Sequence, residues 1–400
     1  MGDKRKNIAV IVQTLCNGGA ERMAANMTIE LQENYNVYLF VFDTTNAIYP
    51  YGGKLVDLKL PPIKDATTLK RIGNTIKRVK LMRQYKKKYH IDCTISHMNG
   101  ANLVNILSRS DDKVFTMFHS MPSDNIPKTW MNKLTQKFIG NQSDQYIVVS
   151  ELGAYDMVHS FDVPRNKVMC IHNFSNVEDI NIRANSELDD SAREFYKSHK
   201  QIIISVGRLS EVKAQYHLVK ILAEMRKHGC EAGLVILGEG PERNKLEDLI
   251  KDKNLLSHVY MPGEVKNPFP YIKHADVFAL CSVYEGLPMV LIEAAACDCP
   301  IVSFDMRSGA REVLAPNSDI LMTAQGIEYA EFGVLVQPCY ENGILSESLL
   351  PEEELFMQAL QELLCNEKLR KQYIERSQQC AYNFSSTKIM GQWNDLIRKL

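Results

Sequence analysis

Runs of apolar, β-forming residues alternate along the chain with stretches whose apolar residues recur at helical spacing. Such runs, bounded by helical patterns, are typical of parallel strands that helices cover on both faces. The runs form two groups, so the pattern predicts an α/β protein with two doubly wound parallel sheets. The first group is 7–15, 37–43, 55–60, 93–96, 114–118 and 146–150; the second is 202–207, 234–238, 259–262, 277–282, 301–304 and 333–336.

The length of the chain and a change in its composition indicate two domains. Four hundred residues exceed the roughly 250–300 residues that one hydrophobic core supports. The change between the two groups falls near residues 172–176, and residues 177–200 are polar and rich in charge. We therefore expect a first domain over residues 1–173 and a second that begins at residue 174. Parallel sheets bind ligands beyond the carboxyl ends of their strands, so a cleft between the domains is the expected site.

The composition is that of a globular chain, with 45% hydrophobic and 24% charged residues. No apolar run approaches the roughly 20 residues of a membrane-spanning helix. The run after the basic start ends near Val12, which is too short for a secretory signal. The ten cysteines are scattered, and Cys297 and Cys299 have no second pair at zinc-ligand spacing. Free thiols and a cytoplasmic location are the expectation.

Charge is distributed unevenly along the chain. Up to His172 there are 23 Lys and Arg against 15 Asp and Glu, and the remainder holds 24 against 33. Much of the basic excess lies in residues 70–88, which contain no acidic residue and have apolar residues at near-helical spacing. A basic amphipathic helix can bind an anionic membrane surface, but it can equally be a solvated helix face. Nucleic acid is not the expected partner, because no aromatic interleaving or known binding motif accompanies the charge.

Two glutamates eight positions apart, Glu285 and Glu293, flank the start of a predicted helix. Gly286 and Pro288 place Glu285 in the preceding loop, whereas Glu293 lies about one turn into the helix. The backbone N–H groups of a helix N-terminus favour a phosphate. Two carboxylates that can accept hydroxyl hydrogen bonds beside a phosphate site indicate a nucleotide-sugar pocket.

Two further segments follow predicted strands and could bind anions. Gly18 and Gly19 open a helix after the first run, where glycine lets backbone N–H groups approach an anion; a tight strand-to-helix turn is the alternative. Gly207 ends the first run of the second group, and Arg208 and Lys213 follow it. Arg208 can bind phosphate oxygens in pairs and Lys213 acts as a point charge, although either residue alone is commonly a surface cation.

Five motifs occur in order along the chain and together resemble one family. They are Gly18-Gly19-Ala20-Glu21-Arg22; Gly207-Arg208-Leu209 with Lys213; Leu237-Gly238-Glu239-Gly240-Pro241; Ala275-Asp276-Val277-Phe278; and Glu285-Gly286-Leu287-Pro288 through Glu293-Ala294. Their series resembles family 4 of the retaining glycosyltransferases, which have the GT-B fold. The resemblance covers essentially the whole chain. It implies two Rossmann-like domains that face a central cleft, the second over residues 174–384, and a helix over 385–400 that packs back on the first.

The resemblance also implies roles for the residues around the two glutamates. Glu293 would accept hydrogen bonds from the ribose hydroxyls of the nucleotide. Glu285 would hold the transferred sugar, with the backbone of the donor-binding residues Gly286, Leu287 and Pro288 nearby.

Further roles follow from the same resemblance. Arg208 and Lys213 would neutralise the diphosphate as it leaves. His119 follows the run 114–118, where the family often places a histidine against the donor sugar; a core or strand-end histidine is the alternative. Gly263 and Val265 would contact the base through the backbone.

The implied reaction is the retaining transfer of a hexosyl or N-acetylhexosaminyl group without a cofactor. Many glycosyltransferases of another fold hold a metal with Asp-x-Asp; this sequence has none, so we expect Arg208 and Lys213 to take the metal's place. Uracil is the commonest base in the family, which makes a UDP-sugar the expected donor. The expected acceptor is a glycan or lipid-linked compound of surface polysaccharide or glycoconjugate synthesis, met at the inner face of the cell membrane.

Two other functions remain open at this point. A nucleotide-sugar epimerase or hydrolase on the same fold would bind the same donor. A catalytically silent module would bind a ligand or partner without turnover. The pair Glu285 and Glu293 favours transfer.

Three departures from the family pattern lie near the predicted site. Ala214 stands where glycine usually follows the lysine. Asp298 replaces a common glycine at the end of the Glu293 helix, where Asp can adopt the left-handed conformation. Residues 315–331 are predicted to be an insertion.

Overall fold

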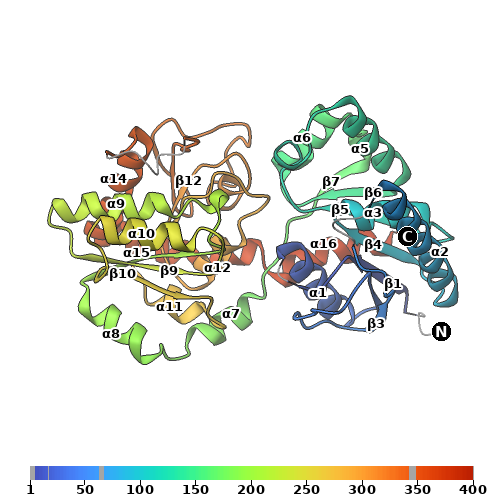
Figure 1. The fold of residues 1–400 in the computed structure, drawn as a ribbon, viewed down its shortest axis with the longest axis horizontal. Coiled ribbons are helices and arrows are strands. Elements are labelled where there is room, and N and C mark those ends of the chain that lie inside the picture. Colours follow the sequence, from blue (N-terminus) through green and yellow to red (C-terminus); the bar gives the residue numbers. More distant parts are fainter. Residues whose placement is uncertain (1–4, 17, 63–66, 342–347, 400) are drawn as a thin grey trace. The chain divides into compact units, whose positions relative to one another are not determined.

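The computed structural model describes the chain except residues 1–4, 17, 63–66, 342–347 and 400 (Figure 1). Contacts divide it into two compact units. The N-terminal unit comprises Met1–Asn173 and Ile389–Leu400, and the C-terminal unit comprises Phe174–Lys388. Each unit is built around a sheet whose carboxyl edge carries predicted site residues.

The N-terminal unit contains a parallel sheet in the order β3-β2-β1-β4-β5-β6-β7. The order reverses between β1 and β4, so this is the switch point of the sheet. Every predicted strand of the first group is present, and β7 was not predicted. The strands are β1 (Asn7–Val12), β2 (Asn36–Val41), β3 (Lys54–Asp57), β4 (Cys93–His97), β5 (Lys113–Phe118), β6 (Gln145–Val148) and β7 (Val168–Cys170).

Helices cover both faces of this sheet (Figure 1). Parallel crossovers are right-handed, so connections that run in one direction along the sheet place their helices on one face. By this rule α2, α3, α5 and α6 share one face, on which α3 packs against α2 and α5, and α1 covers the other. The helical segments are α1 (Gly19–Leu31), α2 (Thr68–Lys88), α3 (Asn99–Leu107), α4 (Pro122–Asn125), α5 (Trp130–Gln142), α6 (Glu151–Phe161) and the 3-10 turn η1 (Arg165–Lys167).

The C-terminal unit repeats the arrangement in the order β10-β9-β8-β11-β12-β14-β13. Its switch point lies between β8 and β11. One edge differs from the expected parallel sheet, because β13 pairs with β14 in the antiparallel sense. The predicted insertion 315–331 contains β13, so part of it extends the sheet. The strands are β8 (Gln201–Val206), β9 (Ala232–Leu237), β10 (Val259–Gly263), β11 (Val277–Leu280), β12 (Ile301–Phe304), β13 (Ile327–Tyr329) and β14 (Val334–Val336).

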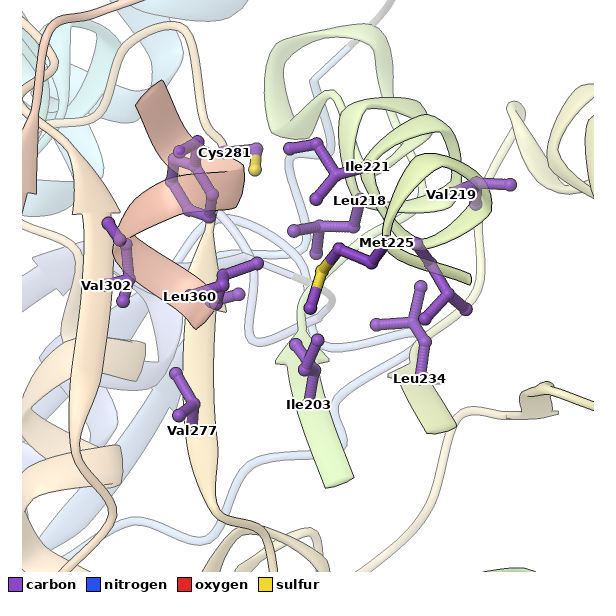
Figure 2. Close-up of a cluster of buried hydrophobic side chains, with 14 of the residues drawn as sticks. Ile203, Leu218, Val219, Ile221, Met225, Leu234, Val277, Cys281, Val302 and Leu360 are labelled. Atoms are coloured by element: carbon purple, nitrogen blue, oxygen red, sulfur yellow. The ribbon is translucent and has the colours of Figure 1, made fainter. Parts of the chain in front are cut away.

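Helices pack on both sides of this second sheet and close its core. Figure 2 shows Ile203 of β8 and Val277 of β11 beside Met225 of α9 and Leu360 of α14, all of them buried. Burial of such side chains is the main favourable term in folding. The helical segments are α7 (Val177–Ala184), α8 (Asp190–Ser198), η2 (Glu211–Lys213), α9 (Tyr216–Lys227), α10 (Arg243–Asp252), α11 (Phe269–Lys273), α12 (Met289–Ala296), α13 (Ala310–Leu314), α14 (Pro351–Cys365) and α15 (Glu367–Asn383).

The last helix, α16 (Ser386–Arg398), ends in the N-terminal unit. Trp393 and Ile397 are fully buried, and Lys6 Nζ donates a hydrogen bond to the carbonyl of Ile397 at 3.1 Å. Their burial accounts for the amphipathic pattern of this final segment.

The basic segment 70–88 lies in α2, but two of its cations are not available to a partner. Lys86 is buried, and its Nζ lies 2.8 Å from Asp112 Oδ2 and 2.7 Å from Asn105 Oδ1. Arg78 donates two hydrogen bonds to the carbonyl of Leu60. The prediction that the whole segment 70–88 can bind an anionic surface is therefore wrong for Arg78 and Lys86. The exposed cations of α2 are Lys70, Arg71, Lys77, Lys80, Arg83, Lys87 and Lys88.

Candidate functional site

An ion pair joins Lys213 and Glu285 at the switch point of the C-terminal sheet. Lys213 ends η2, which follows β8, and Glu285 lies in the loop after β11. Ser282 Oγ also donates to Glu285 Oε1 at 3.0 Å, and the N–H of Val283 donates to the carbonyl of Val212 at 2.8 Å. The two loops are thus held together where ligands of doubly wound sheets bind.

Gly207 and Arg208 lie next to this ion pair. A Cβ atom added at Gly207 would be 3.7 Å from Lys213 Nζ, so the ammonium lies directly beside the glycine. Arg208 is exposed, and its guanidinium makes no ion pair within the described residues. One paired and one unpaired cation therefore border Gly207.

The backbone explains the family preference for glycine at position 214. Ala214 has φ +47° and ψ +39°, the left-handed conformation that glycine adopts without cost. Its side chain is buried. Asp298 has φ +57°, which confirms that the residue after the Glu293 helix adopts the left-handed conformation.

Backbone hydrogen bonds tie the loops after β8, β9 and β10 together. The N–H of Gly207 donates to the carbonyl of Leu237, and the N–H of Gly238 donates to that of Gly263, both at 2.9 Å. A Cβ at Gly238 would lie only 2.0 Å from the Gly207 carbonyl oxygen. Gly238 therefore allows close contact between loops, and Gly263, which ends β10 just before Val265, belongs to the same edge.

Helix α12 begins at Met289 and contains Glu293, which is buried. The preceding loop, with Gly286, Leu287 and Pro288, rests on residues that were not predicted as site residues. Ser308 Oγ donates to the carbonyl of Gly286 at 2.9 Å.

Gly309, next to Ser308, also packs against this loop and was not predicted as a site residue. It has φ +83°, and a Cβ there would be 2.5 Å from Pro288 Cδ. A glycine soon after a predicted strand was the available signal, since β12 ends at Phe304.

The N-terminal unit holds a stacked pair of histidines at the carboxyl edge of its sheet. His119 follows β5, and its Nε2 lies 2.8 Å from Nδ1 of His97, the last residue of β4. The ring centroids are 5.0 Å apart and the planes differ by 18°. His97 was not predicted as a site residue, although it ends the strand at the switch point.

The residue after His97 has an unusual backbone conformation. Met98 has φ +73° and ψ +155°, a region that is nearly confined to glycine and is found at functional sites.

Burial keeps both rings neutral near pH 7. It lowers the pKa of His119 to about 4, an effect that the side chain of Asn173 partly offsets. Burial and the neighbouring His119 lower the pKa of His97 well below its usual value. Since two neutral rings share one hydrogen bond, the tautomer of one ring determines that of the other. Among the described residues, no hydrogen bond of normal distance and angle reaches His119 Nδ1 or His97 Nε2, and both atoms are buried.

Gly18 and Gly19 start α1 at the same edge, after β1. The carboxylate of Glu21 lies against Gly18, because a Cβ added there would be 1.9 Å from Glu21 Oε2. Burial raises the pKa of Glu21. An anion bound at this helix start would therefore meet an acidic side chain, which agrees better with the turn interpretation.

The predicted residues thus fall into two sets. Gly207, Arg208, Lys213, Glu285, Glu293 and their loops lie in the C-terminal unit, whereas Gly18, Gly19 and His119 lie in the N-terminal unit.

The ten cysteines, all within the described residues, form no disulfide. None of the described helices combines the length and apolarity needed to cross a bilayer.

Two doubly wound parallel sheets, each with site residues at the carboxyl edge of its strands, are the architecture of the GT-B fold. Residues 188–379 match the family described as "Glycosyl transferases group 1", and residues 17–179 match "Glycosyltransferase Family 4". The two matches cover successive parts of the chain, which therefore belongs to the family 4 (group 1) glycosyltransferases.

Two related glycosyltransferases align with most of the chain. An uncharacterized glycosyltransferase of Methanocaldococcus jannaschii is 29% identical over 340 residues, 82% of this chain and 83% of the relative. N-acetylgalactosamine-N,N'-diacetylbacillosaminyl-diphospho-undecaprenol 4-alpha-N-acetylgalactosaminyltransferase of Campylobacter jejuni is 28% identical over 394 residues, 96% of this chain and 97% of the relative.

A solved structure has the same fold. HepE of Anabaena, in complex with UDP and glucose, has a TM-score of 0.75 and 15% identity, and the match covers 98% of this chain and 99% of that one.

Proposed function

We propose that the protein is a retaining, metal-independent glycosyltransferase that moves a sugar from a UDP-sugar to a hydroxyl of a lipid-linked or glycan acceptor. The observation that carries this proposal is the ion pair of Lys213 with Glu285 beside Gly207 and Arg208. A carboxylate and a cation that meet at one sheet edge, with Arg208 beside them, support the binding of a sugar by Glu285 and of a diphosphate by Lys213 and Arg208.

In the proposed transfer, negative charge develops on the departing diphosphate. The bond between the anomeric carbon and the phosphate oxygen breaks, and the acceptor oxygen forms the new bond on the same face. The acceptor proton passes to the departing phosphate oxygen. Arg208 and Lys213 lower the barrier because fixed cations stabilise the growing charge of the diphosphate; removing one such group typically costs about 10²–10³ in rate.

The ion pair gives Glu285 and Lys213 linked roles. A diphosphate beside Gly207 competes with Glu285 for the Lys213 ammonium. The carboxylate then loses its cationic partner and can accept a hydroxyl of the transferred sugar. Donor binding would in this way prepare both groups at once.

His119 is proposed to hydrogen-bond the donor sugar through Nδ1, the ring nitrogen that His97 leaves free. Because His97 holds Nε2, it fixes the orientation and tautomer of His119. His97 is thus a positioning residue and does not need to touch the substrate.

The acceptor is proposed to be lipid-linked and the transferred unit an N-acetylhexosamine or hexose. The name of the Campylobacter relative supports this, since its acceptor is a diphospho-undecaprenol compound. The exposed cations of α2 provide charge for an anionic membrane surface, each contributing about 1 kcal/mol near such a surface. We place the enzyme at the cytoplasmic face of the membrane, in surface polysaccharide or glycoconjugate synthesis.

Thermal unfolding with UDP, GDP and ADP tests the donor site. A nucleotide at 100 times its Kd stabilises the chain by about 2.7 kcal/mol. UDP should give the largest shift, and Glu293→Gln, which keeps the shape of the side chain but removes its charge, should reduce it. Product analysis of UDP-sugars with and without undecaprenyl-diphosphate-linked sugar then tests transfer. Interconversion of the sugar without an acceptor would show an epimerase and overturn the proposal.

A further inference from the structure

Helix α5 carries four large apolar side chains on its solvent-facing side. The exposed fractions are 73% for Trp130, 61% for Met131, 56% for Leu134 and 44% for Phe138. At 3.6 residues per turn these four fall within a sector of about 100°. We call them the α5 stripe. Contiguous apolar surface of this kind usually marks a protein or membrane contact.

The opposite side of α5 is fixed in the N-terminal unit. Gln136 and Ile139 are buried, and Tyr146 Oη donates to Gln136 Oε1 at 2.7 Å. A Cβ at Gly140 would lie 2.3 Å from Val163 Cγ1, so the helix packs there without room for a side chain. Because these contacts set the rotation of α5, the stripe cannot turn toward the core.

The charged side chains of α5 and of the five residues before it have one sign, although Asp124 and Asp144 flank this segment. Residues 125–143 include Lys128, Lys133 and Lys137 and no Asp or Glu. Tryptophan with flanking lysines suits the boundary between headgroups and acyl chains, where the ring is buried and the ammonium groups reach lipid phosphates. The charge complementarity therefore favours an anionic lipid surface as the occupant.

Helix α2 adds to this surface. It covers the same face of the sheet as α5, with α3 packed against both (Figure 1). Its first two turns also expose large apolar side chains, and cations follow along the same side. The residues are Leu69, Ile72 and Ile76, then Lys80, Arg83 and Lys87. Exposed apolar and basic side chains thus occur on two helices that cover the same face of the sheet, which suits contact with a lipid surface.

We propose that the α5 stripe inserts into the headgroup region of an anionic bilayer while the exposed cations of α2 contact the lipid charge. The inference deepens the proposed function, because a lipid-linked acceptor is presented by such a bilayer. An inserted apolar face lies about 5–10 Å below the surface. Insertion makes binding partly resistant to salt, whereas contact through cations alone weakens steeply as ionic strength rises.

Trp130 is a reporter for this insertion. The chain has two tryptophans, and the other, Trp393, is fully buried. Emission is measured with vesicles of phosphatidylcholine plus phosphatidylglycerol, with and without brominated acyl chains, and with phosphatidylcholine alone. Trp130→Phe keeps an apolar ring and gives the background from Trp393. We expect a blue shift and bromine quenching with the anionic vesicles, both absent in Trp130→Phe.

A matched pair of variants tests the stripe itself. Leu134→Ser with Phe138→Ser should weaken vesicle binding at least about tenfold, because both apolar side chains are then lost from the lipid contact. Ile182→Ser with Leu256→Ser removes two exposed apolar residues of the C-terminal unit and should leave binding unchanged. Far-UV circular dichroism and Tm confirm that both double variants fold.

Three results would overturn the inference. One is vesicle binding without a change in Trp130 emission, which would leave contact through α2 alone. Another is no binding to anionic vesicles at low salt. The third is a stripe that mediates self-association, seen by sedimentation as a dimer that Leu134→Ser with Phe138→Ser dissociates.

Failure of the proposed function would look different from failure of this inference. UDP release from a UDP-sugar in solution should be the same for wild type and for Leu134→Ser with Phe138→Ser, since α5 holds no donor group. A wild type that binds vesicles through Trp130 but never turns over a UDP-sugar would refute the glycosyltransferase proposal and leave the membrane contact standing.

Discussion

Lys213 and Glu285, 72 positions apart in the sequence, form an ion pair in which each side chain keeps slightly less than a fifth of its surface exposed. Their proximity follows from the sheet order, because β8 and β11 are neighbours although β9 and β10 lie between them in the chain.

Substitutions of Lys213 and Glu285 should affect UDP binding differently. Lys213→Ala should lower the transfer rate by about 10²–10³ and weaken UDP binding, because a cation for the diphosphate is lost. Glu285→Gln should also lower transfer, yet bind UDP as tightly as wild type or more tightly, since Lys213 loses its competing carboxylate. Calorimetric titration with UDP and initial rates measure both. Equal loss of UDP affinity in the two variants would contradict the competition between Glu285 and phosphate.

The histidine pair predicts a positioning effect. His97→Phe should lower kcat about tenfold with little change in the donor KM, since one buried hydrogen bond of roughly 1–2 kcal/mol no longer orients His119. His97→Asn, whose side-chain amide can donate or accept a hydrogen bond in place of Nδ1, should restore part of the rate. If both variants reduce kcat equally while folding normally, His97 does not act through its hydrogen bond.

Burial of the histidines predicts acid sensitivity. The folded chain holds the pKa of His119 near 4, below the unfolded value of about 6.5. This contribution to stability is therefore complete above pH 6.5 and decreases as the pH falls toward 4, by about 3 kcal/mol at pH 4. Urea unfolding at pH 7, 5.5 and 4 measures the decrease, which should be smaller in His119→Asn. An identical pH dependence in wild type and variant would show that His119 is not the group responsible.

Lys86 predicts a stability effect within α2. Lys86→Met should lower the free energy of unfolding by about 3–5 kcal/mol, because Asp112 remains buried without its cation. Lys87→Met, at the exposed neighbour, should change it by less than about 0.5 kcal/mol. The double variant Lys86→Met with Asp112→Asn removes both buried charges and should fold. Vesicle binding should be weaker in Lys87→Met but unchanged in this double variant. Comparable destabilisation by both single variants would contradict the distinction.

Gly309 predicts a loop effect on the donor site. Gly309→Ala places a Cβ against Pro288 and forces φ +83° on a side-chain residue, so the Gly286–Pro288 loop must shift. UDP affinity should fall several-fold. Gly326→Ala is the matched control, since its added Cβ would have no atom of the described residues within 4 Å apart from its own chain neighbours. Similar UDP affinity in the two variants would show that the loop does not bind the donor.

The order of residues along the chain determined much of this protein. Continuous apolar runs such as 202–207 require strands covered on both faces, and the motif from Glu285 to Glu293 indicates the family because each glycine and charge stands at a fixed place relative to a strand end. The sequence could not identify β7 or β13, which are short edge strands with exposed residues and so lack a continuous buried run. The equally short β14 was predicted because all three of its residues are buried.

Tertiary structure alone decided which charges have partners and which residues meet. Lys86 and Lys87 are alike in sequence, but only the packing of α2 against α3 buries one beside Asp112 and exposes the other. His97 ends β4 and His119 follows β5, and only the pairing of these two strands brings His119 Nε2 to 2.8 Å from His97 Nδ1. The reason is physical: sheet register and helix rotation are set by the packing of many distant side chains together, so no local pattern contains them.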